Sequence, residues 1–271
     1  MGRATDFRSR NNVTTLGGGA RTLLFANGFG CDQSIWRFVA PALAHDYRVV
    51  LFDYAGSGRS DPAAYDPRRY NSLDGYARDI TEIAEALELR DAVLVAHSIG
   101  CTVGIRAALE APHLFERLVL LNPSPRFLND PPDYVGGFER SDIDALLDLM
   151  GRNFFEWASA FSGMIVKEPA LAREMRDTFC ALNRNAASRF AELAFLSDAR
   201  EDLPRVRHPS LVVQCSRDDI APTVVGEYVH RHLLRSKYVL LDAAGHCPHI
   251  SHPREIEARV RQYLRTPTEG L

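Results

Sequence analysis

Short apolar runs and helical apolar patterns alternate along the first half of the chain. Near-continuous apolar runs, typical of strands buried on both faces of a sheet, cover residues 22–26, 48–52, 93–95 and 118–121. Between them, apolar residues recur every three or four positions, which predicts helices over 34–43, 73–87 and 100–109. A weaker run at 13–15 predicts an edge strand. This order of strands and helices predicts a parallel, doubly wound α/β sheet.

The pattern changes after Pro123, where four prolines interrupt the chain within ten residues. The next stretch lacks a strand pattern and predicts helices over 141–150, 154–166, 171–182 and 186–196. Strand patterns return at 211–215 and 238–241, and helical patterns cover 224–233 and 253–264. We therefore expect one α/β core, formed by residues 1–123 and 197–271, with a helical cap inserted at 124–196.

Composition and charge narrow the class of protein. The 271 residues are 46% hydrophobic and 25% charged, which is ordinary for a globular protein with a substantial core. A net charge of -3 gives no reason to expect nucleic acid or a membrane as a partner, and no apolar run is long enough to span a bilayer. Residues 1–12 are polar with no apolar segment following, so we expect no signal peptide. Five scattered cysteines without C-x-x-C spacing indicate neither a disulfide framework nor a zinc site, and we expect a cytoplasmic protein.

Ser98 lies where the run at 93–95 meets the predicted helix at 100–109. A serine between small residues at such a junction is typical of the nucleophile elbow G-x-S-x-G, in which a strained turn exposes the hydroxyl above the sheet. Ala96 stands at the first glycine position of that pattern. The sequence leaves the effect of this alanine on catalytic rate open.

Two further side chains follow late strands in the order that a Ser–acid–His triad requires. Asp218 follows the strand at 211–215, four residues before a proline, and His246 follows the strand at 238–241 after a glycine. Because the carboxyl ends of parallel strands meet at one edge of a sheet, we expect Ser98, Asp218 and His246 to meet there.

Neighbouring side chains compete for these roles. Asp219 is the alternative acid and would otherwise be a loop residue or a helix N-cap. His249 and His252 are alternative bases, but both lie beyond a proline, where we expect the last helix to begin. His97 is expected to pack or hydrogen-bond beneath the elbow.

An oxyanion hole needs backbone N–H groups aimed at the developing negative charge. Ile99, directly after the serine, is one expected donor, and Phe29, in the loop after the strand at 22–26, is the other. Asn27 is expected to brace that loop. Aromatic side chains are expected to line an apolar substrate pocket: Phe29, Phe138, Trp157, Phe161 and Phe195. We expect small buried fillers rather than reactive thiols at two cysteines near the site, Cys31 and Cys247.

The chain resembles members of the α/β-hydrolase superfamily. Within it, the chain resembles the branch of the bacterial stress-response regulator RsbQ and the plant karrikin and strigolactone receptors. The resemblance is carried by residues 28–36, 129–138 and 245–249 and extends over about 12–264. It implies an α/β-hydrolase fold with Ser98, Asp218 and His246 as the triad beneath a four-helix cap. It also implies that members can act as receptors whose slow hydrolysis accompanies signalling.

We therefore predict a serine hydrolase of a small apolar ester or lactone, which requires no metal or organic cofactor. Ser98 would attack the carbonyl, His246 would carry the proton, and Asp218 would orient the imidazole. The alternative is a small-molecule-sensing regulator that binds a signalling protein partner and keeps the same triad. A carbon–carbon bond hydrolase is disfavoured by the absence of an obvious basic anchor, and serine at the elbow argues against dehalogenase or epoxide-hydrolase chemistry.

Overall fold

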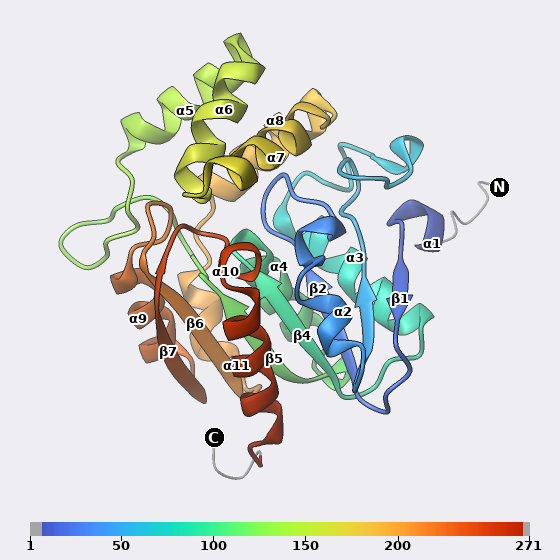
Figure 1. Cartoon of the computed structure of the whole chain (residues 1–271). Coiled ribbons are helices and arrows are strands. Elements are labelled where there is room, and N and C mark those ends of the chain that lie inside the picture. Colours follow the sequence, from blue (N-terminus) through green and yellow to red (C-terminus); the bar gives the residue numbers. More distant parts are fainter. Residues whose placement is uncertain (1–6, 268–271) are drawn as a thin grey trace.

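The computed structural model describes residues 7–267, so the first six residues of the segment considered for a signal peptide lie outside it. Within the described part, seven strands form one sheet in the order β1-β3-β2-β4-β5-β6-β7 (Figure 1). The strands are β1 (Thr14–Leu16), β2 (Thr22–Ala26), β3 (Arg48–Leu51), β4 (Ala92–His97), β5 (Phe115–Leu121), β6 (Ser210–Arg217) and β7 (Ser236–Ala244). β1 pairs antiparallel with β3, and the other neighbours pair in parallel, which confirms the predicted sheet.

Helices cover both faces of the sheet. In Figure 1, α2 (Ala40–Leu43) and α11 (Pro253–Arg265) lie in front of the strands, and α3 (Leu73–Ala86) and α4 (Ile99–Glu110) lie behind them. The remaining core elements are α1 (Phe7–Arg10), α9 (Thr223–His232), α10 (Pro248–Ser251) and the 3-10 turns η1 (Gln33–Trp36), η2 (Pro62–Ala64), η3 (Pro112–Leu114) and η4 (Arg200–Arg205). β2 and β4 are buried at every position, as expected for strands covered on both faces. No helix in residues 7–267 is long and apolar enough to cross a membrane.

The predicted helical cap lies between β5 and β6. It comprises α5 (Arg140–Arg152), α6 (Phe154–Ile165), α7 (Pro169–Cys180) and α8 (Arg184–Leu196), which sit over the carboxyl ends of the strands (Figure 1). Local sequence sets where each helix begins. Asn153 and Asn183 accept hydrogen bonds from the first turns of α6 and α8, and a capping box precedes α5. The domain limits at 123/124 and 196/197 stay a prediction.

Two helix predictions were wrong in detail. The single helix expected over 34–43 is broken into η1 and α2. Pro41 lies in the first turn of α2, and it lacks the N–H that a continuous helix would need to bond the carbonyl of Arg37. The last helix begins at Pro253, so His249 lies in the separate short helix α10 and His252 is the N-cap of α11.

Glycines allow α4 to pack closely on the strands beside it. A Cβ on Gly100 would lie 2.3 Å from the backbone oxygen of Asn27, which belongs to the loop after β2. The methyl group of Ala96 faces Gly104, where an added Cβ would lie 3.6 Å away, an ordinary van der Waals contact. Alanine therefore fits the first small position of the elbow, because its methyl group lies at an ordinary contact distance from this part of α4.

We expect Gly100→Ala to lower the free energy of unfolding by roughly 1–3 kcal/mol, because the new methyl group would push against backbone rather than a movable side chain. Gly163→Ala is the matched control, since Gly163 lies in the last turn of α6 and a Cβ there meets no atom within 4 Å. It should raise stability by about 0.5–1 kcal/mol. Urea unfolding of both variants checks this, and equal effects would contradict the packing described.

Candidate active site

Ser98 occupies the sharp turn between β4 and α4. Its backbone has φ 56° and ψ -129°, in the positive-φ region that residues with a side chain seldom adopt. Its N–H donates to the carbonyl of Leu121 at the end of β5, which holds the turn against the neighbouring strand. Such strain is found where a turn presents a nucleophile above the carboxyl edge of a sheet.

The structure brings Ser98, His246 and Asp218 into one hydrogen-bonded row. The Oγ atom of Ser98 lies 2.7 Å from Nε2 of His246, and Nδ1 of His246 lies 2.7 Å from Oδ2 of Asp218. The other carboxylate oxygen of Asp218 accepts from the backbone N–H groups of Ile220 and Ala221. Because an ionised carboxylate only accepts hydrogen bonds, Nδ1 of His246 donates to it and Nε2 is left to accept from the serine.

Asp219, the competing acid, lies away from this row. Its carboxylate is exposed and forms an ion pair with Lys167, and the N-cap of α9 is Pro222. Of the two roles considered for it, Asp219 therefore takes that of a loop residue.

The backbone of His246 is fixed at both of its polar atoms. Its carbonyl accepts from Nε2 of His97 at 2.8 Å and from Nδ2 of Asn122 at 3.0 Å. Its N–H donates to the carbonyl of Ile165, the last residue of cap helix α6, at 2.7 Å. His97 therefore hydrogen-bonds beneath the elbow, as expected. Sequence reasoning missed Asn122, whose only signal was an amide side chain at the end of a buried strand, and Ile165, which contributes only its carbonyl.

The other two histidines considered as bases do not contact Ser98. His249 is buried, and burial together with the nearby His246 lowers its pKa to about 3. His252 lies at the start of α11, with its Nδ1 atom 2.9 Å from Oγ of Ser251. His97 is buried too, and burial followed by the neighbouring histidines holds its pKa well below the usual value. Both buried rings, His97 and His249, are therefore neutral near pH 7.

Two backbone N–H groups beside Ser98 are available to a ligand. Those of Phe29 and Ile99, the expected oxyanion donors, donate to no other residue among those the structure describes. A Cβ on Gly28 would lie 2.6 Å from Nδ1 of His97 and 3.3 Å from Cβ of Ser98, so glycine allows this loop to approach the serine. Asn27 braces the loop, since it donates to the carbonyl of Phe52 and accepts from Nε1 of Trp36.

A small apolar cavity lies beside Ser98 and His246. Of the expected pocket residues, Phe29, Phe161 and Phe195 line it. It has about 20 Å³ open to the centres of water molecules, room for about one water. Sequence reasoning missed further lining residues, which come from the loop after β5, from the cap and from the loop after β6: Phe127, Ile165, Ala194 and Ile220.

Two expected pocket residues are not part of this lining. Trp157 packs its ring on that of Phe161, with centroids 5.6 Å apart, and belongs to the interior of the cap. Phe138 lies where its N–H donates to the carbonyl of Phe127. Cys31 and Cys247 do line the cavity, and burial raises the pKa of both thiols, which favours their protonated form.

Comparisons with known proteins agree with this architecture. A family model described as the alpha/beta hydrolase family matches residues 23–259. The chain is 40% identical to a probable esterase of Oryza sativa subsp. japonica, over 90% of this chain and 91% of that protein. It is 37% identical to the karrikin insensitive 2 receptor CA of Petunia hybrida, over 90% and 91%. The solved structure of a hydrolase from Oleispira antarctica superposes with a TM-score of 0.95 at 36% identity and covers 97% of each chain.

We expect Asn27→Ala to lower the free energy of unfolding by about 2 kcal/mol or more, because it leaves the buried indole N–H of Trp36 and the carbonyl of Phe52 without partners. Asn71→Ala, at an exposed position, should change stability by less than about 0.5 kcal/mol. Denaturant unfolding compares the two variants, and similar small effects would show that the brace contributes little.

Proposed function

The chain belongs to the alpha/beta hydrolase family, and from that membership we propose that it hydrolyses a small apolar ester or lactone through an acyl-enzyme. The observation that carries this proposal is the unbroken row of hydrogen bonds from Asp218 through His246 to Ser98. A serine hydroxyl is a weak nucleophile until a base removes its proton, and this row supplies the base and the group that orients it.

In the proposed mechanism, Oγ of Ser98 attacks the carbonyl carbon while Nε2 of His246 takes the hydroxyl proton. Asp218 stabilises the imidazolium that forms. The N–H groups of Phe29 and Ile99 bind the oxyanion of the tetrahedral intermediate. When the intermediate collapses, His246 gives its proton to the departing alkoxide. Water then attacks the acyl-serine by the same route and releases the acid; with a lactone, the alcohol stays attached to the acyl group.

The residues that line the cavity favour a substrate with a short, uncharged acyl group. No Asp, Glu, Lys or Arg side chain lines it among the described residues, and the polar side chains in its lining are those of Ser98, His246, His97 and the two cysteines. A charged acyl group would therefore lose its water without gaining an ionic partner, which is unfavourable. The small volume disfavours long chains for a separate, steric reason.

A second candidate is a small-molecule-sensing regulator of the stress-response type. It is favoured by one observation: relatives at similar identity include both a protein named an esterase and a protein named a receptor. In this role, ligand binding beneath the cap would alter the surface that a signalling protein recognises, and slow hydrolysis would accompany it. A cellular response that survives Ser98→Ala would favour the regulator over turnover as the biological output.

The two adjacent aspartates allow a matched test of the triad. We expect Ser98→Ala to reduce hydrolysis of p-nitrophenyl acetate by at least about 10³-fold, and Asp218→Asn to reduce kcat by about 10³–10⁴-fold, because the imidazole loses its orienting carboxylate. Asp219→Asn, one residue along and exposed, should change kcat by less than about 3-fold. Activity retained in Ser98→Ala would refute the proposal, and equal losses at both aspartates would refute the choice of acid.

Acyl chain length tests the cavity. The unmodified enzyme should prefer p-nitrophenyl acetate to the octanoate, and Phe161→Ala should shift kcat/KM toward the longer ester by about 10-fold or more, because it removes a ring from the lining. Phe155→Ala is the control, since Phe155 lies on the same helix but is 60% exposed. A shift of the same size in both variants would mean that the cavity does not set the preference.

A further inference from the structure

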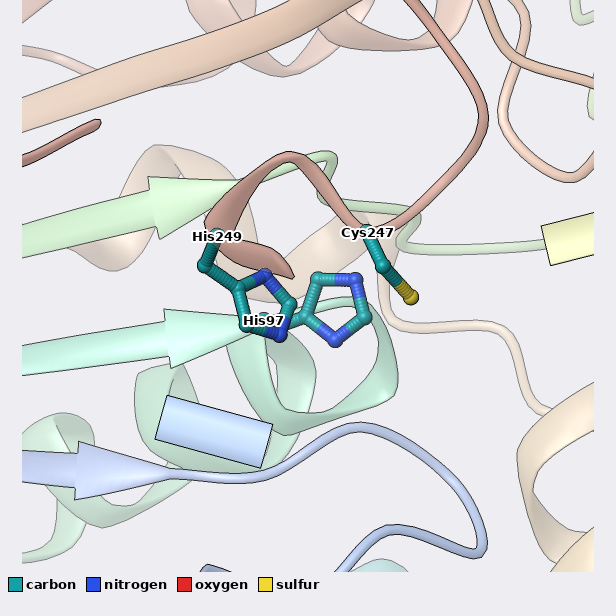
Figure 2. A group of neighbouring side chains, drawn as sticks. All are labelled: His97, Cys247 and His249. Carbon is teal, nitrogen blue, oxygen red and sulfur yellow. The ribbon is translucent and has the colours of Figure 1, made fainter. Parts of the chain in front are cut away.

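Three side chains of types that bind metals lie close together (Figure 2). They are His97, Cys247 and His249, and His97 is hydrogen-bonded to the carbonyl of His246. They come from the end of β4, from the residue after His246, and from helix α10. One potential ligand atom of each lies within 4.8 Å of the other two. All three residues are buried.

Each imidazole ring of this cluster has one nitrogen with a free lone pair. Nε2 of His97 hydrogen-bonds to a carbonyl oxygen, so it carries the proton, and in the neutral ring Nδ1 is left as an acceptor. That Nδ1 atom is buried and has no partner, and neither ring nitrogen of His249 has one. Unpaired buried polar atoms cost free energy. One nitrogen of His249 carries the proton of the neutral ring, so two unpaired lone pairs, one on each ring, lie in one small region and point to a ligand that uses them.

We propose that His97, Cys247 and His249 form a binding site for one thiophilic d¹⁰ cation, of the class of Zn²⁺ and Cd²⁺, and that its occupation inhibits the hydrolase. Two imidazoles and a thiolate are the donors that such borderline and soft ions prefer. Burial keeps both imidazoles neutral, which is the form that binds a metal. Binding replaces the S–H bond of Cys247 with a sulfur–metal bond and releases the proton to solvent.

The geometry needs only a small adjustment. With Zn–N and Zn–S bonds of about 2.0 and 2.3 Å, tetrahedral ligand atoms lie about 3.4–3.6 Å apart, so the widest separation must close by about 1 Å. No side chain of residue 28 covers Nδ1 of His97, because that residue is a glycine and a Cβ there would lie only 2.6 Å from Nδ1. Trp36 packs against His249, with ring centroids 4.4 Å apart and ring planes tilted by 32°, and holds that ring in place. His97 and Cys247 line the cavity, so a water in it supplies the fourth ligand.

We expect inhibition because two of the proposed metal ligands, Cys247 and His97, are linked directly to His246. Cys247 is bonded to His246, and His97 holds the carbonyl of His246 by a hydrogen bond. Drawing both ligands toward one ion displaces His246 from Ser98, and the ion also occupies one wall of the cavity. Metal binding itself does not depend on the proposed hydrolysis; only the inhibition does.

Titration of the purified full chain with Cd²⁺ tests the site, with the ultraviolet charge-transfer band of the Cd–thiolate bond as readout. We expect one Cd²⁺ per chain, loss of the band in Cys247→Ala, and at least about 10-fold weaker binding in His249→Leu. Cys180→Ala should keep the band, because Cys180 is an exposed thiol on α7. Ser98→Ala should also keep it, since an ion held by Ser98 and His246 instead would be lost there.

The proposal is overturned if no band forms, if the band persists in Cys247→Ala, or if it is lost in Cys180→Ala. A cluster filled only by a buried water gives no band and so overturns it as well. Should Cys247→Ala or His249→Leu fail to fold, the cadmium NMR shift of the unmodified protein distinguishes one sulfur and two nitrogen ligands from other donor sets.

Hydrolysis of p-nitrophenyl acetate with and without Zn²⁺ tests the inhibition separately. We expect at least about 10-fold loss of kcat on saturation, and unchanged kcat at full occupancy would overturn this part. If the protein binds Cd²⁺ as described but hydrolyses no ester, the metal site stands and the proposed function fails, so the two failures are distinguishable.

Discussion

The position of the His246 backbone is the constraint on which the rest of the site depends. Its N–H bonds to Ile165 in the cap, and its carbonyl bonds to His97 and Asn122 in the core. Because its backbone N–H and its carbonyl are both hydrogen-bonded, His246 cannot shift its backbone or rotate its peptide groups. Only its side-chain ring can still move. Asp218 then fixes the ring. The cap therefore does more than cover a cavity, because the end of α6 is one of the supports of the histidine.

The close approach of backbone segments around Ser98 is the second constraint on the site. The strained backbone of Ser98 is stable only because surrounding chain segments pack tightly around the turn. Glycine at 28 and 100 allows the loop after β2 to lie against the serine and against α4. Ala96 is under no such requirement, since even a Cβ on the facing Gly104 would lie 3.6 Å from its methyl group; a Cβ there would instead approach Cδ2 of Leu94 to 2.7 Å.

The sequence was informative where function follows a local pattern. Buried parallel strands are near-continuous apolar runs, so their carboxyl ends could be located, and the serine, aspartate and histidine that follow them could be expected to meet. It was uninformative where a contact joins distant backbone. Asn122 and Ile165 both contact a residue more than eighty positions away in sequence, and no local pattern indicates that partner. The apolar spacing over 34–43 is helical, so a single helix was predicted there although the segment contains Pro41. Trp157 was expected in the cavity lining and Phe127 was not, because spacing cannot show which aromatic ring faces the serine.

Burial and the position of Asp218 explain why His246, rather than His97 or His249, is suited to act as the base. The ring of His97 lies against those of both His246 and His249, and all three residues are buried. Burial disfavours the charged forms of His97 and His249, and neither of these rings is hydrogen-bonded to a carboxylate. His246 alone of the three contacts an aspartate. The choice of base is thus made by the position of Asp218 rather than by any property of the histidine, and the two rings left without an acid are the ones whose lone pairs remain open to a metal.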